Sequence, residues 1–250
     1  MVDYDGTLAP FRGGRELALP HPGVPEAIKR ILKAGGTRLV VASGRALADL
    51  EARTDWIVPR PDLWGSHGLE RRAADGSLSA PPIPLPLTDL LDRIGQWIEE
   101  RGWLDLFERK PFGFALHERA DPERYPEART ALLEWWRSSL DRRGLVALPF
   151  DGGLEFRPAG SSKGRVVESV LAELPPGASV AYLGDDRTDE DAFLALRGHG
   201  LRVLVRDRRR PTEADLWLRP PEDLIGFLTR WERATWAEAR LPAGANGGAA

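Results

Sequence analysis

The chain has 250 residues, of which 42% are hydrophobic and 29% charged, so it is long enough to bury a substantial core and has the composition of a globular protein. Its formal net charge of -3 gives no basic excess, which argues against nucleic acid or an anionic membrane as its partner. It contains no cysteine, which excludes disulfides, a thiolate nucleophile and a Cys-ligated zinc site. We see no signal peptide and no apolar run of membrane-spanning length, and we therefore expect a cytoplasmic protein.

The first part of the chain predicts a strand, a helix and a second strand. The opening residues "MVDYDGT" suggest a short strand that runs into a loop. Apolar residues at helical spacing predict a helix over 24–34, which ends at Gly35 and Gly36. Residues 37–42 then predict a buried strand. This order favours a parallel sheet with helical crossovers.

The middle of the chain has a different pattern. After a Gly/Pro-rich connector we expect a helix over 89–101, strands over 103–110 and 112–119, a helix over 126–143, and strands over 145–150 and 152–158. An insert of this size can bury its own small core. We therefore assign a second domain to residues 82–156.

The last part returns to the pattern of the first. We expect helices over 163–174, 188–196 and 220–232 and strands over 179–186, 201–205 and 214–218. Residues 1–81 and 157–235 should therefore share one sheet, while residues 236–250 should be a disordered tail. The predicted fold is α/β: a doubly wound, mostly parallel sheet with an inserted α/β cap domain.

The stretch "DYDGT" places two carboxylates where a strand gives way to a loop. Asp3 and Asp5 are two residues apart, so on an extended chain their side chains point the same way. Gly6 follows at once, and a glycine lets the backbone come close to a ligand. A strand-end aspartate can simply cap a turn, but two of them beside Gly6 and Thr7 favour a site.

The stretch "GDDRTDED" is a second acidic cluster at a predicted strand end. Ordinary helix capping explains Asp189 and the two acidic residues after it. It does not explain Asp185 beside Asp186, which repel one another unless a cation compensates. An oxygen-only ligand set favours Mg²⁺ over zinc or copper.

Two further stretches could hold phosphate. "ASGR" offers the hydroxyl of Ser43, a backbone N–H and the guanidinium of Arg45, although Ser43 could equally cap the next helix. Lys163 lies at a predicted helix start, where the helix dipole disfavours a cation unless anions are near; a solvated lysine is the alternative. Together the four stretches suggest phosphoryl transfer with a carboxylate nucleophile. Since no Gly-x-x-x-x-Gly-Lys loop is present, hydrolysis is favoured over ATP-driven transfer.

In this order, "DYDGTL", "SGR", Lys163 and "GDDRTDED" resemble the four motifs of the haloacid dehalogenase (HAD) superfamily of phosphatases. The blocks "GSHGLE", "ERKPFGFALHER", "LEFRPAGSSKG" and "YLGDDRTDEDAF" are similar to those of the trehalose-6-phosphate phosphatase family. The resemblance covers nearly the whole chain. Two departures stand out: only two residues precede Asp3, so we expect a short first strand, and Pro111 follows Lys110 where the family often has glycine.

The resemblance implies a role for each motif residue. Asp3 should be the nucleophile that forms an aspartyl-phosphate, and Asp5 the general acid and then the general base. Ser43 and Lys163 should bind the phosphoryl group. Mg²⁺ should be held by carboxylates and one carbonyl, which the resemblance assigns to Asp3, Asp5 (through its backbone carbonyl) and Asp185, with Asp186 or Asp189 in support.

The resemblance also assigns sugar recognition to the inserted cap. The residues that match the family's cap elements are Glu108, Lys110, His117, Arg119 and Glu155. Arg45 and His67 should face the cap from the core side and contact the substrate. Without the resemblance, an exposed strand face would explain Glu108 and Lys110, and a satisfied core histidine would explain His117.

The implied activity is Mg²⁺-dependent hydrolysis of trehalose 6-phosphate to trehalose and phosphate. Three alternatives within the same chemistry are glucosylglycerol phosphate, glucosylglycerate phosphate and sucrose phosphate; a non-catalytic module with the same fold is a further one. We expect a monomer that binds a small sugar phosphate, and association with a trehalose-phosphate synthase stays open.

Overall fold

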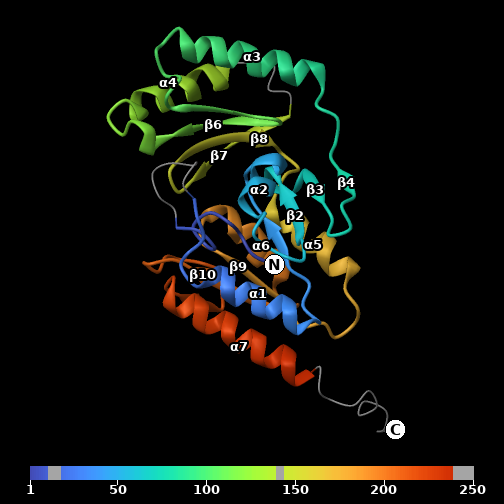
Figure 1. The fold of residues 1–250 in the computed structure, drawn as a ribbon. Coiled ribbons are helices and arrows are strands. Elements are labelled where there is room, and N and C mark those ends of the chain that lie inside the picture. Colours follow the sequence, from blue (N-terminus) through green and yellow to red (C-terminus); the bar gives the residue numbers. More distant parts are fainter. Residues whose placement is uncertain (11–17, 139–143, 239–250) are drawn as a thin grey trace.

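The computed structural model describes residues 1–10, 18–138 and 144–238, and it divides into two layered units, one above the other in Figure 1. The lower unit is built from both ends of the chain. The upper unit comprises a sheet with two helices on its outer side (Figure 1). Its chain segment leaves the lower unit after β4 (Leu78–Ser79) and returns through β8 (Gly153–Pro158).

The lower sheet is mostly parallel. Its strands are β1 (Val40–Ala42), β2 (Asp62–Gly65), β3 (Glu70–Arg72), β4, β9 (Ala181–Gly184), β10 (Leu201–Val205) and β11 (Leu216–Leu218). Val2 forms parallel bridges to Val41 in β1 and to Leu183 in β9, so the N-terminal segment joins the two halves of the sheet. β1 pairs with β2 in parallel, as do β9, β10 and β11, while β3 and β4 are antiparallel. Val2 therefore occupies the centre of the sheet, and Asp3 is the next residue in the chain.

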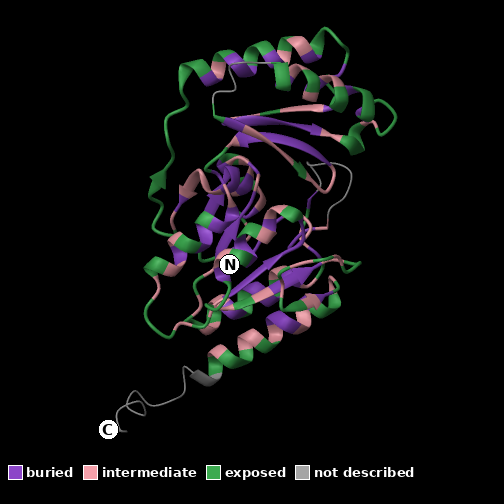
Figure 2. Cartoon of the chain, turned by 180° about the vertical axis from the view of Figure 1, so that it is seen from behind, coloured by how far each residue is buried: buried purple, intermediate pink, exposed green. Residues whose placement is uncertain are grey.

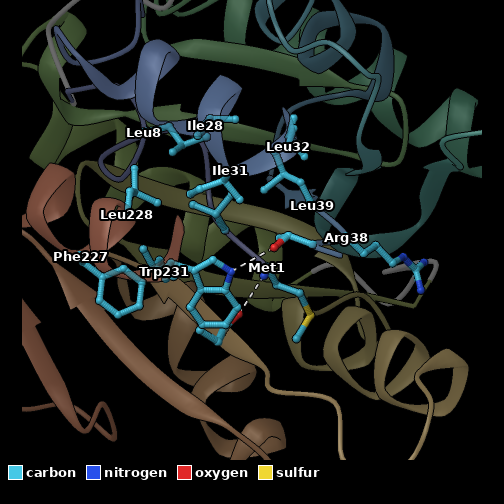
Figure 3. A pocket seen from close by; sticks show the side chains of 14 residues that line it. Met1, Leu8, Ile28, Ile31, Leu32, Arg38, Leu39, Phe227, Leu228 and Trp231 are labelled. Atoms are coloured by element: carbon cyan, nitrogen blue, oxygen red, sulfur yellow. Dashed lines mark hydrogen bonds between the residues drawn. The ribbon is translucent and has the colours of Figure 1, made fainter. Parts of the chain in front are cut away.

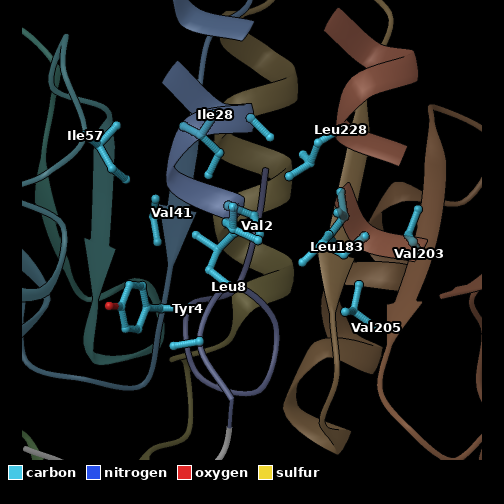
Figure 4. Close-up of a cluster of buried hydrophobic side chains, with 14 of the residues drawn as sticks. Val2, Tyr4, Leu8, Ile28, Val41, Ile57, Leu183, Val203, Val205 and Leu228 are labelled. Carbon is cyan, nitrogen blue, oxygen red and sulfur yellow. The ribbon is translucent and has the colours of Figure 1, made fainter. Parts of the chain in front are cut away.

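Helices cover both faces of this sheet. Figure 4 shows one face, where Val2, Val41 and Leu183 pack with side chains from α1 (Val24–Ala34) and α7 (Glu222–Glu238). Tyr182, which alternates with Leu183, packs on the other face against α5 (Lys163–Glu173) and α6 (Glu190–Leu196). The predicted doubly wound α/β arrangement is confirmed.

The upper sheet has its own core. Its strands are antiparallel in the order β5 (Phe107–Lys110), β6 (Gly113–His117), β8 and β7 (Leu145–Phe150). Phe114 and Phe156 lie on its outer face and pack beneath α3 (Leu85–Glu99) and α4 (Tyr125–Ser138), with their rings stacked 4.3 Å apart. The buried residues of Figure 2 accordingly lie in both units, on the two faces of the lower sheet and beneath the helices of the upper sheet.

Several expected element bounds differ from the structure. α3 begins at Leu85 rather than at residue 89, because prolines are tolerated in the first turn of a helix. α7 continues to Glu238, and so includes the first three residues of the expected tail; residues 239–250 lie outside the described residues. α2 (Leu47–Arg53) and β2 were not predicted, because seven and four residues are too few for a clear periodic signal.

An apolar pocket lies at the amino ends of the lower strands, opposite the edge to which Asp3 leads. Ile31, Leu39, Phe227 and Trp231 line it beside Met1 (Figure 3). Its volume of about 70 Å³ is far below that of a typical ligand pocket. Within the described part of the chain, no helix combines the length and apolar character needed to cross a membrane.

Candidate active site

The four motifs meet at the carboxyl edge of the lower sheet. Asp3 follows the bridge at Val2, Ser43 follows β1, and Asp185 follows β9. Lys163 is the first residue of α5. Because parallel strands end at one edge, residues far apart in sequence come together there, as is usual for ligand sites of open α/β sheets.

Lys163 lies at the centre of a buried charge cluster. Its Nζ lies 2.8 Å from Asp3 Oδ1 and 2.8 Å from Asp189 Oδ1, and all three residues are buried. Burial alone would lower the pKa of Lys163, but Asp189 and Asp3 hold it above its usual value. Lys163 is therefore an ammonium ion that touches the carboxylate expected to be the nucleophile.

Three buried carboxyl groups lie close together beside this single lysine. Among the described residues, carboxylate oxygens of Asp3, Asp185 and Asp189 lie within 4.8 Å of one another. Burial raises the pKa values of Asp3 and Asp185, and the neighbouring carboxylates raise them further. Three buried acids around a single ammonium are costly to ionise together, and a divalent cation would stabilise their ionised forms. An all-oxygen donor set fits Mg²⁺.

Gly6 is required by the way this cluster packs. Its φ of +84° is in the left-handed region, and a Cβ on it would lie 2.0 Å from Asp185 Oδ2. No side chain fits there without displacing the Asp185 carboxylate. Thr7 Oγ1 lies 3.4 Å from Asp185 Oδ1, a weak contact that also holds this carboxylate beside the first motif.

Asp189 is fully engaged with protein groups. Its Oδ1 accepts hydrogen bonds from Lys163 Nζ and, at 2.7 Å, from the Tyr182 hydroxyl. Its Oδ2 accepts from the backbone N–H groups of Asp185 and Asp186, at 3.1 and 3.0 Å. Asp189 therefore fixes the lysine and the acidic loop. The Tyr182 contact was not expected, because a tyrosine within a buried strand pattern carries no signal of its own.

Asp5 and Asp186 point to other partners. Arg45 donates to both oxygens of Asp5, from Nε and from Nη2, each at 2.6 Å. Asp186 caps the turn Arg187–Asp189 and also accepts from the backbone N–H of Asp151 at 3.1 Å. Neither carboxylate belongs to the cluster of Asp3, Asp185 and Asp189. Ser43 is buried at the same edge, where its Oγ accepts from the Arg45 backbone N–H at 3.1 Å.

The upper sheet contributes Glu155 and Lys110 to this edge. These two residues form an ion pair, and Lys110 Nζ also donates to the Gly44 carbonyl at 3.3 Å. His67 Nε2 lies 2.8 Å from Glu155 Oε2. His67 is held in the left-handed region, with φ of 54°, which is uncommon for a residue with a side chain and is typical of functional loops.

The inner face of the upper sheet carries charged groups that pair with one another. Register pairs Glu108 with Ala115 and Ala115 with Glu155, so these three lie in one row across that face. His117 Nε2 lies 2.7 Å from Glu108 Oε2. Arg119 follows β6 in an exposed turn. Charged residues separated by alanine and glycine are suited to a ligand rich in hydroxyls.

A family model described as trehalose-phosphatase matches residues 1–220. The chain belongs to this family. The resemblance inferred from its motifs is thereby confirmed. A trehalose-phosphate phosphatase of Mycobacterium tuberculosis is 33% identical over 250 residues, which cover 92% of this chain and 60% of the relative. The chain thus spans about 60% of the length of the curated relatives that it matches.

Solved structures share the fold. The C-terminal domain of trehalose-6-phosphate phosphatase from C. albicans has a TM-score of 0.77 at 21% identity, covering 93% of this chain and 90% of that one. A phosphatase of the haloalkanoate (HAD) enzyme superfamily from Bacteroides thetaiotaomicron has a TM-score of 0.60 at 19% identity, covering 92% and 93%. The predicted HAD-like fold is confirmed.

Proposed function

We propose that this chain hydrolyses trehalose 6-phosphate to trehalose and phosphate. The observation that carries the proposal is the contact of Asp3 with Lys163 beside Asp185. The polar face of the upper sheet covers the edge of the lower sheet where this contact lies. The family match and the mycobacterial relative support the substrate. Residues 82–156 would act as the cap that encloses the sugar.

Mg²⁺ would be held by Asp3, the backbone carbonyl of Asp5 and Asp185. Asp189 would support the site by fixing the loop, as its hydrogen bonds to the backbone of Asp185 and Asp186 indicate. The bound cation would neutralise charge on the phosphoryl oxygens.

Asp3 would attack phosphorus through one carboxylate oxygen, and the bond between phosphorus and the sugar oxygen would break. Lys163 would reduce the repulsion between the Asp3 carboxylate and the incoming dianion, because its ammonium already contacts Asp3. Ser43 would donate its hydroxyl to a phosphoryl oxygen. The product of this step is an aspartyl-phosphate on Asp3.

Asp5 would give a proton to the departing sugar oxygen. In the second step it would take a proton from the water that attacks phosphorus, and Asp3 would leave as a carboxylate. In the structure both Asp5 oxygens accept from Arg45. One of these two contacts would have to open when Asp5 exchanges a proton, while the other would keep Asp5 in position.

Sugar recognition would fall to the inner face of the cap. Glu155 and Lys110 pair with one another in the structure, as do Glu108 and His117. Hydroxyls of the disaccharide would replace these contacts. Charged groups that are left without partners by the wrong sugar would reject it more strongly than an apolar pocket could.

The test is phosphate release from a panel of sugar phosphates, with Mg²⁺ and with EDTA. We expect the highest kcat/KM for trehalose 6-phosphate and no release in EDTA. Higher kcat/KM for sucrose phosphate, glucosylglycerol phosphate or glucosylglycerate phosphate would overturn the substrate. Release that EDTA leaves unchanged would overturn the magnesium requirement.

A further inference from the structure

The turn between β7 and β8 reaches from the upper sheet to the acidic loop of the lower unit. At its tip, the Asp151 backbone N–H donates to Asp186 Oδ1 at 3.1 Å, with Oδ2 at 3.3 Å. Asp151 is separated from Asp186 by 35 positions in the sequence. This contact lies apart from the sugar-facing row of Glu108 and Glu155.

Arg206, which belongs to the lower unit, contacts the same turn. It follows β10, and its Nη1 donates to Asp151 Oδ2 at 2.8 Å and to the Asp185 carbonyl at 3.1 Å. The backbone of Arg206 is fixed on both sides: its N–H donates to the Leu218 carbonyl, and its carbonyl accepts from Trp217 Nε1 at 2.8 Å. A rigid strand end thus presents one guanidinium to both units.

Arg210 holds the acidic loop without touching the turn. It donates to the Asp186 carbonyl at 2.6 Å and, more weakly, to the Asp185 carbonyl at 3.3 Å, and it pairs with Glu190. The loop therefore has an anchor that belongs entirely to the lower unit. Arg206 adds to this anchor a contact that exists only when the turn lies against the loop.

We propose that Arg206 is a positioning residue that couples closure of the cap to the placement of the Asp185–Asp186 loop. The Arg206–Asp151 pair acts as a latch. The kinetic part of this inference rests on the proposed function, because turnover reports closure only if the chain is a phosphatase. Side-chain exposures of 28% and 34% leave both partners accessible to water. The latch can therefore open without the penalty of a fully buried pair, and the substrate can enter.

This role has a specific kinetic consequence. If the latch favours the closed form, its loss lowers the fraction of enzyme that is ready to hold the sugar. The apparent dissociation constant for substrate rises by the inverse of that fraction, so KM rises while kcat changes less. For one charge-assisted contact we expect an increase of up to about tenfold in KM.

The test measures closure directly as well as turnover. Because the chain contains no cysteine, Glu127→Cys in α4 and Glu168→Cys in α5 provide two unique and exposed sites for spin labels. The distance between the labels is measured by double electron–electron resonance in the full chain. The variants are Asp151→Asn, Arg206→Ala and the charge swap Asp151→Arg with Arg206→Asp.

Arg202→Ala is the matched control. Arg202 lies on the same strand that leads to Arg206 and pairs with Asp215, far from the turn. We expect Asp151→Asn and Arg206→Ala to add a population with longer distances and to raise KM, the charge swap to restore part of the short population, and Arg202→Ala to leave the distances unchanged.

Distances that are the same in Arg206→Ala and the parent would overturn the latch, whether or not the protein hydrolyses any substrate. Equal losses in Arg202→Ala and Arg206→Ala would also overturn it, because they would reveal a general loss of stability. An inactive parent whose labels still respond to Arg206→Ala would overturn the proposed substrate and leave the latch standing.

Discussion

The guanidinium of Arg45 holds the carboxylate of Asp5 through two parallel hydrogen bonds, each 2.6 Å long. Arg45 is almost wholly buried, and its third nitrogen pairs with Asp49 on α2. The two-pronged contact fixes both the direction and the charge of Asp5 in the absence of substrate. The sequence predicted that Arg45 contacts the substrate, whereas in the structure Arg45 binds Asp5, the proposed general acid and base.

Arg45→Lys should therefore impair catalysis although it keeps the positive charge. A lysine cannot reproduce the two parallel bonds, and misplacement of Asp5 should lower kcat by about tenfold to a hundredfold. Steady-state kinetics on trehalose 6-phosphate measure this effect. Asp49→Asn is the control: it weakens the contacts of Asp49 with Arg45 and Arg53 and leaves Asp5 untouched, and we expect a much smaller change. Equal effects of the two variants would count against a special role for the contact with Asp5.

Gly6→Ala should weaken the magnesium site. The new Cβ would lie 2.0 Å from Asp185 Oδ2 and would push that carboxylate away. We expect the Mg²⁺ concentration for half-maximal activity to rise by about tenfold to a hundredfold, the range seen when groups that orient metal ligands are lost. A Mg²⁺ titration of the rate measures it.

Gly76→Ala is the control for backbone strain. Gly76 has φ of +90° in an exposed turn, and a Cβ on it would meet no other atom within 4 Å. The substitution should cost about 1 kcal/mol of unfolding free energy and leave the Mg²⁺ titration unchanged. If both glycine variants shift the titration equally, crowding of Asp185 is not the cause.

Much of this site could be predicted from short stretches of sequence. Asp3, Asp185 and Lys163 follow or begin regular elements of one parallel sheet, so the rule that strand ends share an edge brings them together. The pairings could not be predicted in the same way. Arg45 reaches Asp5 from the loop between β1 and α2, and Asp151 reaches Asp186 because a hairpin of the second sheet extends to it. Such contacts depend on how elements are placed in three dimensions, and local spacing does not encode that.

Tyr182→Phe should reduce both stability and turnover. The hydroxyl that donates to Asp189 Oδ1 at 2.7 Å would be lost, and leaving a buried carboxylate short of a partner costs about 1–3 kcal/mol. Because the same oxygen holds Lys163, we expect kcat to fall as well. Chemical denaturation and steady-state kinetics measure the two effects.

Tyr4→Phe is a matched control for this prediction. Tyr4 is equally buried, but its hydroxyl donates to the Ala18 carbonyl, away from the acidic cluster. It should lose stability while kcat stays near the parent value. A kcat for Tyr182→Phe that equals that of Tyr4→Phe would show that Tyr182 has only a structural role.

His67 should make stability depend on pH. Burial lowers the pKa of His67 from 6.5 to about 4, although Glu155 opposes the shift. Between these values the unfolded chain binds the proton and the folded chain does not, so this contribution is complete above pH 6.5 and is lost as the pH falls toward 4. The loss amounts to about 3 kcal/mol.

Denaturation at several pH values should therefore show a steeper decline between pH 6.5 and 4 for the parent chain than for His67→Gln, which cannot be protonated there. Carboxylates that do not contact His67 lose stability in acid in both proteins, so the difference between the two curves reports His67 together with its partner Glu155. Parallel curves would contradict a buried neutral imidazole.

Asp3 is the residue on which the proposed chemistry depends. The most direct measurement is the initial rate of phosphate release from trehalose 6-phosphate in Mg²⁺ by the parent chain and by Asp3→Asn, a variant that keeps the shape of the side chain but not its nucleophilic oxygen. We expect turnover by the parent and a rate lower by more than about a thousandfold in Asp3→Asn. No release by the parent, or comparable rates for the two proteins, would contradict the proposed role of Asp3.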